Sequence, residues 1–266
     1  LYALGRTANV EGLHLENTGI KVDAKGYIPV NALFQTIVPH IYAVGDAVEK
    51  TDALDKGATL VPLANIANRH GRVIADHIAG KKTREVDAQG TAIVKVFDLT
   101  VATSGWNEKR LKAANKPYVA IHNHPASHAG YYPGAQAMSL KLLVDPQSAR
   151  ILGVQGVGKE GVDKRIDVIS TAMRGGITAP ELADLELAYA PPFGSAKDPV
   201  NMLGYISENV LSGITPTAQW YEVEDLKRYI KATKEFPGFK KIDFKWSEGT
   251  GHDFPRLDRK STRLNS

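Results

Sequence analysis

The chain has 266 residues, of which 43% are hydrophobic and 23% are charged, and it contains no cysteine. This composition predicts a globular protein with one large domain or two of ordinary size. The net charge of +4 is too small to indicate nucleic-acid binding, and part of it comes from the last nine residues. The lack of cysteine excludes a disulfide, a thiolate metal site and a cysteine nucleophile within these residues.

Membrane insertion and secretion are not indicated either. No apolar run approaches the ~18 residues that a membrane span needs. No basic segment followed by an apolar one resembles a secretory signal. We therefore expect a cytoplasmic protein without membrane or nucleic-acid partners, and the first residue, Leu1, predicts that the chain is truncated at its front.

Residues 1–82 have the pattern of the end of an α/β domain. A buried strand is expected at 1–5, and an extended piece is expected at 26–30, after a Lys–Gly turn. A short β-rich run follows at 41–44. From Thr59 the pattern becomes helical until Gly80, with one apolar stripe. The stripe consists of Leu63, Ile66, Ala67, His70, Ile74, Ile78 and Ala79.

A polar segment separates this part from a second predicted domain at 88–213. Its alternation of short apolar runs and helical stretches predicts an α+β domain, with helices packed on one face of an antiparallel sheet. A β-rich segment is expected at 91–103, followed by strands at 118–122, 138–144 and 151–157, and the expected helices are 107–114, 162–173 and 201–211.

The remaining residues have a different character. Residues 214–257 are rich in lysine and aromatic residues, with one helical pattern at Val223–Ile230. Residues 258–266 resemble a translated sequencing adapter, so we treat them as a non-native tail and exclude them from the fold prediction.

Gly45-Asp46 is the most informative pair of residues. It follows the β-rich run, so the glycine allows the backbone to approach a ligand and the aspartate can accept hydrogen bonds from hydroxyl groups. A Gly-Asp pair alone is a common turn. Thr59-Leu60-Val61-Pro62-Leu63-Ala64-Asn65 then has the pattern of a helix start, whose free amides and dipole favour negative charge.

Together with Leu4-Gly5-Arg6-Thr7-Ala8-Asn9, these motifs resemble the C-terminal part of the pyridine nucleotide-disulfide oxidoreductases. The resemblance is strongest to the coenzyme A-disulfide reductase branch. It implies a fold class of α/β and α+β: the C-terminal end of a flavoprotein with two dinucleotide-binding domains, followed by an α+β dimerisation domain.

The resemblance also implies the cofactors FAD and NAD(P)H. Hydride would pass from NAD(P)H to FAD and then to a redox cysteine that lies before Leu1. The residues whose positions match the flavin-contacting motifs are Gly45, Asp46, Pro62, Leu63, Ala64 and Asn65.

Residues 128–134, 189–193 and 197–202 resemble the interface domain of the same branch. The resemblance implies a homodimer in which two tyrosines reach the partner's active site, and Tyr131 and Tyr189 match those positions. Phenols there could hydrogen-bond a thiolate or protonate a leaving thiol. Tyr132 is the nearest competitor, and both tyrosines could instead be packing residues. The implied substrate is coenzyme A disulfide or another small disulfide or persulfide.

Two other functions fit the same residues. One is an NADH oxidase or peroxidase of the same architecture, and the other is a non-catalytic dimerisation module. Several members of the branch carry a rhodanese domain, and Thr217–Glu222 resembles the start of one.

Two further motifs are discounted. Gly156-Val157-Gly158-Lys159-Glu160-Gly161 matches a dinucleotide fingerprint, but no second parallel strand or suitably spaced acidic residue follows. His122, His124 and His128 have a spacing that could bind a metal, but no acidic ligand lies nearby in the sequence. We therefore expect no metal site.

Overall fold

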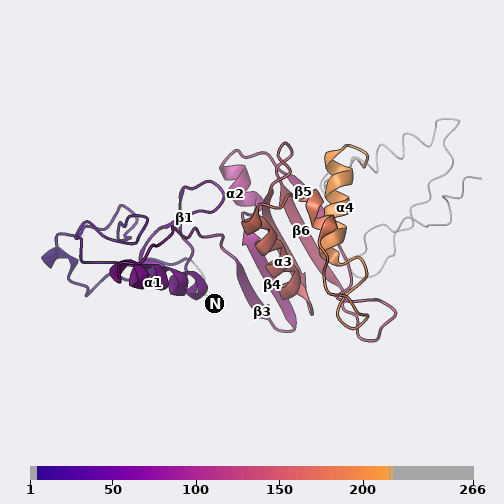
Figure 1. Cartoon of the computed structure of the whole chain (residues 1–266), viewed down its shortest axis with the longest axis horizontal. Coiled ribbons are helices and arrows are strands. Elements are labelled where there is room, and N and C mark those ends of the chain that lie inside the picture. The colour runs from indigo at the N-terminus through magenta and orange to yellow at the C-terminus, as the bar shows by residue number, and fades with distance from the viewer. Residues whose placement is uncertain (1–4, 216, 218–266) are drawn as a thin grey trace, which may run out of the picture. The chain divides into compact units, whose positions relative to one another are not determined.

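A computed structural model describes residues 5–215 and residue 217 (Figure 1). The chain divides into two units, of which the first is Leu1–Thr215. Every element below belongs to the first unit. The predicted strand at 1–5 lies almost wholly outside the described residues, and so do the rhodanese-like start or linker at 214–257 and the tail at 258–266.

The N-terminal part of the first unit consists mainly of turns around one long helix. It contains two 3₁₀ helices, two short strands that pair antiparallel, and a helix that ends at Ile78. The bounds are η1 Leu15–Asn17, η2 Gly45–Ala47, β1 Lys50–Thr51, β2 Ala58–Thr59 and α1 Ala64–Ile78. Their small core contains Ile20, Ile28, Phe34, Val48 and Val73.

Two expectations for this part were wrong. Residues 41–44 form no strand, since only Tyr42 makes an isolated bridge, to Gln35. The helix begins at Ala64 and not at Thr59, because Pro62 disfavours a helical conformation at the residue before it and Leu63 is extended (φ −129°, ψ 131°). The predicted stop at Gly80 is confirmed, since this glycine has a φ of 70°.

The second part is an α+β domain with a five-stranded sheet in the order β3-β4-β7-β6-β5. All neighbouring strands pair antiparallel, as the sequence predicts. The strands are β3 Ala92–Val96, β4 Leu99–Gly105, β5 Val119–Asn123, β6 Met138–Val144 and β7 Ile151–Gly158. The helices are α2 Glu108–Ala113, α3 Val162–Gly175, η3 Pro180–Asp184 and α4 Pro199–Leu211.

Local signals explain where these helices begin and end. The Asn107 side chain caps α2 by accepting a hydrogen bond from the amide of Arg110. Helix α3 lies between two left-handed glycines, Gly161 and Gly176. Helix α4 begins with a capping box between Asp198 and Asn201, and Pro199 occupies its first turn.

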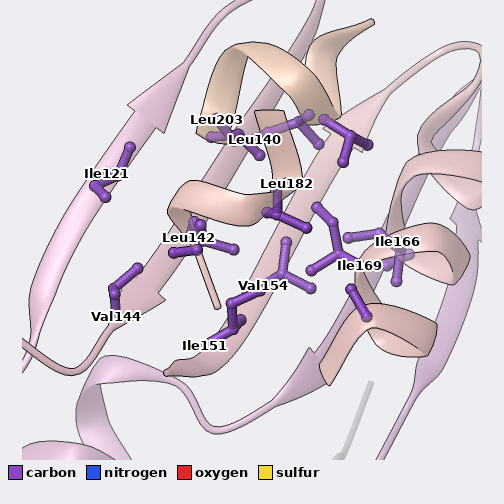
Figure 2. Close-up of a cluster of buried hydrophobic side chains, with 14 of the residues drawn as sticks. Ile121, Leu140, Leu142, Val144, Ile151, Val154, Ile166, Ile169, Leu182 and Leu203 are labelled. Atoms are coloured by element: carbon purple, nitrogen blue, oxygen red, sulfur yellow. The ribbon is translucent and has the colours of Figure 1, made fainter. Parts of the chain in front are cut away.

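One face of the sheet forms the main core (Figure 2). Alternate strand residues such as Leu142 and Val154 point toward Ile166 and Ile169 of α3, and η3 and α4 complete the layer with Leu182 and Leu203. Figure 1 shows α3 lying along the sheet, in line with its packing against β4 and β7.

Helix α2 departs from the expected one-sided packing. Ala120, Leu143 and Leu152 alternate with the main-core positions and therefore point to the other face. There they pack against Trp106 and against Leu111 of α2. The short helix α2 thus covers one end of the second face, because Leu111 needs an apolar surface to bury against.

No element of the described residues covers the rest of the second face. The register places Val94, Val101, Val157 and Ser139 in one row across the sheet. The neighbouring row consists of Ala92, Thr103, Gln155, Lys141 and His122. A shallow apolar depression of about 420 Å³ lies over the centre of these rows.

Candidate functional site

The Gly45-Asp46 turn is held by a buried lysine. Gly45 has a φ of 84°, a left-handed conformation that favours glycine. Lys50 is only 4% exposed, and its ammonium donates hydrogen bonds to the carbonyl oxygens of Gly45 and Val48. Burial lowers the pKa of Lys50. The Asp46 side chain is 61% exposed, and its carboxylate lies 3.9 Å from the Arg6 guanidinium.

The start of α1 lies against this turn. A Cβ atom on Gly45 would lie 3.9 Å from the Cβ of Ala67. Helix α1 starts after Leu63, and no side chain in the described part of the chain caps it. The amides of Ala64 and Asn65 therefore point out of the helix at the positive end of its dipole.

Asp46 and Pro62 line the same groove, which has a volume of about 60 Å³. Arg6, Tyr27, Lys50 and Leu60 complete most of its wall. The exposed Asp46 carboxylate fits the hydroxyl groups of a flavin ribityl chain. Of the six residues predicted to contact the flavin, only Asp46 and Pro62 line this groove. Gly45, Leu63, Ala64 and Asn65 do not line it, although the start of α1 follows directly after Pro62. Lys50 was not predicted from the sequence, and Arg6 was noted there only as part of the Leu4–Asn9 motif, without a place in this groove.

Tyr131 and Tyr189 form the second part of the candidate site. Their hydroxyl oxygens lie 2.9 Å apart in a hydrogen bond, although the residues belong to different loops. The side chains are exposed, with 76% of Tyr131 and 46% of Tyr189 accessible. The hydrogen bond with Tyr131 is the largest cause that raises the pKa of Tyr189, because Tyr189 must keep its proton in order to donate it.

Tyr132 has a different environment. Its ring packs edge-on against His128, with centroids 5.7 Å apart, and His128 is buried. Its amide donates to the carbonyl of Ala129, which closes a tight turn. This geometry favours Tyr131 over Tyr132 as the partner of Tyr189. In the described residues, no hydrogen bond or ion pair joins the tyrosine pair to the Asp46 groove.

The two discounted motifs have structural explanations. Both neighbours of β7 are antiparallel, so Gly156 and Gly158 do not belong to a βαβ unit. A Cβ on Gly156 would lie 2.9 Å from Val162, and one on Gly158 would lie 2.8 Å from Met138. Gly161 takes the left-handed conformation before α3. These glycines thus serve close packing and the turn.

The three histidines have separate environments. The rings of His122 and His124 stack with centroids 6.5 Å apart, whereas His128 packs against Tyr132. Burial, with a smaller effect from Lys141, lowers the pKa of His122. Across residues 5–215, no group of three or more His, Asp or Glu side chains is arranged to hold a metal ion. The same residues contain no helix that is long and apolar enough to cross a membrane.

Two regions of the chain match known family domains. Residues 91–199 match the dimerisation domain of the pyridine nucleotide-disulphide oxidoreductases, and residues 1–71 match the pyridine nucleotide-disulphide oxidoreductase domain itself. The chain belongs to this family. The predicted resemblance and fold class are confirmed: the chain is the end of the nucleotide-binding part followed by the dimerisation domain.

Individual pyridine nucleotide-disulphide oxidoreductases are similar over most of the described chain. The coenzyme A disulfide reductase of Staphylococcus aureus (strain JH9) is 44% identical over 193 residues, which is 72% of this chain and 43% of the relative. The crystal structure of reduced Bacillus anthracis CoADR-RHD has a TM-score of 0.80 and 46% identity, over 85% of this chain and 41% of that one.

A third similar protein is the NAD-dependent persulfide reductase from A. fulgidus, with a TM-score of 0.78 and 39% identity, over 84% of this chain and 41% of that one. The chain thus spans less than half the length of these relatives. The similarity therefore shows the family of this chain but not the activity of a complete enzyme.

Proposed function

We propose that the chain is the C-terminal portion of an FAD-dependent NAD(P)H:disulfide oxidoreductase that acts on coenzyme A disulfide, or on a small persulfide or polysulfide. The similarity to a coenzyme A disulfide reductase and to a persulfide reductase supports this choice. The observation that carries it is the exposed hydrogen bond between Tyr131 and Tyr189. A cytoplasmic location is part of the same proposal.

The tyrosine pair has the chemistry that thiol release requires. A thiolate that leaves a disulfide must be stabilised or protonated, and a phenol can do both as a hydrogen-bond donor. When Tyr189 donates to Tyr131, the hydroxyl proton of Tyr131 can point to a substrate sulfur. The raised pKa of Tyr189 keeps its phenol neutral, so that it remains the donor to Tyr131. The redox cysteine must come from outside this chain, which contains none.

The Asp46 groove would hold the flavin. When bound, FAD supplies a two-electron carrier between nicotinamide and the cysteine. Asp46 accepts hydrogen bonds from ribityl hydroxyls, and Gly45 leaves room for the chain. Pro62 and Leu63 place the start of α1, so that the amides of Ala64 and Asn65 favour negative charge on the pyrimidine.

The open face of the sheet is the surface we assign to the homodimer. Its apolar row includes Val94, Val101 and Val157, which are 55%, 40% and 37% exposed. Exposed apolar rows of this kind mark interaction surfaces on water-soluble domains. A second copy that packs face to face would bury both rows and give the dimerisation domain its partner.

The first experiment recovers the reading frame upstream of Leu1 and expresses the complete protein. A dinucleotide fingerprint with a lone cysteine after it supports the reductase. Tyr131→Phe and Tyr189→Phe should then each lower kcat/KM for coenzyme A disulfide by about 10²-fold, in the range of a lost general acid. Tyr132→Phe is the matched control and should retain activity.

Other outcomes would overturn the proposal. Oxygen consumption without coenzyme A disulfide reduction would identify an NADH oxidase instead. A complete protein that binds no FAD would leave a dimerisation module. For the interface, Val157→Glu should shift the dimer to monomer in sedimentation, whereas Ile78→Glu, at an exposed position of α1, should not. Unchanged sedimentation of Val157→Glu would exclude this face.

A further inference from the structure

The main core contains a buried arginine that the tyrosine chemistry does not use. Arg165 is 1% exposed and lies on the core face of α3. Its Nε donates to Oδ1 of Asp198 at 3.2 Å, and its Nη2 donates to Oδ2 at 2.8 Å. Asp198 is itself 3% exposed. A buried guanidinium is tolerated only when it is paired and hydrogen-bonded in this way.

The same guanidinium also binds the first tyrosine loop. Nη2 donates to the carbonyl oxygen of Ser127 at 2.9 Å, and Nη1 donates to that of Gly161 at 3.2 Å. Ser127 begins the loop that carries Tyr131, and the Ser127 side chain accepts a hydrogen bond from the Gln136 amide where the loop returns. Arg165 therefore holds the base of this loop by its backbone.

The Asp198 side of the pair holds the second tyrosine loop. Asp198 ends the segment that starts at Tyr189, and its Oδ1 accepts the Val200 amide at the start of α4. Within that segment, the carbonyl of Gly194 accepts the Ala129 amide of the first loop at 2.8 Å. The two loops therefore contact each other directly, and each is also bound to one member of the Arg165–Asp198 ion pair.

We propose that Arg165 is a positioning residue for the tyrosine pair: together with Asp198 it fixes both loops, so that the hydroxyls of Tyr131 and Tyr189 stay within hydrogen-bonding distance. The geometric part of this inference concerns the chain alone. Its consequence for catalysis rests on the proposed function.

The simplest competing explanation is an ion pair that serves only stability. It predicts that altered pairs lower the melting temperature without changing the tyrosine contact in protein that is still folded. The two explanations therefore differ in a property of the tyrosines and not in stability.

Arg165→Lys and Asp198→Asn are the deciding variants. A lysine ammonium can still pair with Asp198, but it cannot reach both Ser127 and Gly161 as the planar fork does. An asparagine keeps an acceptor for the Val200 amide and removes the charge. Arg174→Met, on the same helix with a side chain 54% exposed, is the matched control.

The readout is titration of the tyrosine rings by NMR in the whole chain labelled with ¹³C at Cζ, with Tyr131→Phe and Tyr189→Phe for assignment. In the unaltered chain and in Arg174→Met, Tyr189 should titrate above the ordinary ~10. In Arg165→Lys and Asp198→Asn, its pKa should fall to the value found in Tyr131→Phe. The melting temperature should also fall, by about 10 °C in Asp198→Asn, which leaves a buried charge unpaired.

Two results would overturn the inference. The first is a folded Arg165→Lys protein in which Tyr189 titrates as before. The second is an unfolded one, because the pair would then support the whole domain and not the two loops. In the complete enzyme, Arg165→Lys should lower kcat/KM about as much as Tyr131→Phe does. Arg165→Lys and Tyr131→Phe could both change the titration of Tyr189 and yet leave the complete enzyme fully active. In that case the positioning role stands and the proposed function fails.

Discussion

Asp52→Ala tests how the N-terminal part is attached to the sheet. Asp52 is 3% exposed, and its Oδ2 accepts the indole N–H of Trp106 at 3.0 Å and pairs with Arg110 at 2.7 Å. Its Oδ1 accepts the Leu54 amide at 2.8 Å. Trp106 is also 3% exposed, and the Arg110 guanidinium lies over its ring at 4.0 Å. The Asp52 carboxylate therefore joins the N-terminal part to the segment that carries Trp106 and Arg110.

The cost of this substitution follows from burial. The Trp106 N–H would be left unsatisfied, which costs ~1–3 kcal/mol. The ion pair contributes at most ~1 kcal/mol, because the Arg110 side chain is 39% exposed and can be hydrated instead. The free energy of unfolding should thus fall by about 1–4 kcal/mol, which lowers the melting temperature by roughly 2–15 °C in a domain of this size.

Urea and thermal unfolding of the chain measure this change. Asp55→Ala is the control, since Asp55 is exposed and only caps a local turn through the Gly57 amide. A double-mutant cycle with Trp106→Phe should give a coupling of about 1 kcal/mol or more. The reasoning fails if Asp52→Ala is no less stable than Asp55→Ala, or if the cycle shows no coupling.

Three further predictions concern stability. Leu142→Ala should cost about 3–5 kcal/mol in urea unfolding, because this side chain is 0% exposed in the main core. Gly105→Ala should cost about 3 kcal/mol or more, since its φ is 73° and the new Cβ would lie 2.5 Å from the Leu152 carbonyl oxygen, whereas Gly134→Ala, with φ 92° and open space, should cost only about 1 kcal/mol. Burial lowers the pKa of His70 below its ordinary ~6.5. Neutral His70 therefore contributes to the stability of the fold above that pH, and this contribution is lost as the pH falls toward the folded-state pKa. His70→Gln should thus make the melting temperature fall less steeply between pH 7 and about 5 than it does in the unaltered chain.

Most of the second domain could be predicted from the sequence. Helix α3 and strand β6 begin where expected, because their apolar residues have clear periods of about 3.6 and 2. The N-terminal part was harder. Residues 41–44 are rich in β-formers, but a strand needs a partner, and here only Tyr42 finds one.

The candidate site could likewise be predicted only in part. Tyr131 and Tyr189 could be named from a family resemblance, but their contact depends on two loops that meet in space. Lys50 was missed because nothing local predicts that a lysine beside a turn is buried. Arg165 had a usable signal: it stands at i+3 from Val162 on the apolar stripe of α3, where an arginine must find a buried partner.

The way in which Arg165 holds the tyrosine loops has a consequence for evolution. It binds the first loop through the main-chain carbonyl of Ser127, a group that every amino acid possesses. Substitutions at the tip of that loop can therefore change the groups presented to a ligand without changing the path of the backbone. Residues 130–133 can therefore vary while the buried support at Arg165 stays the same.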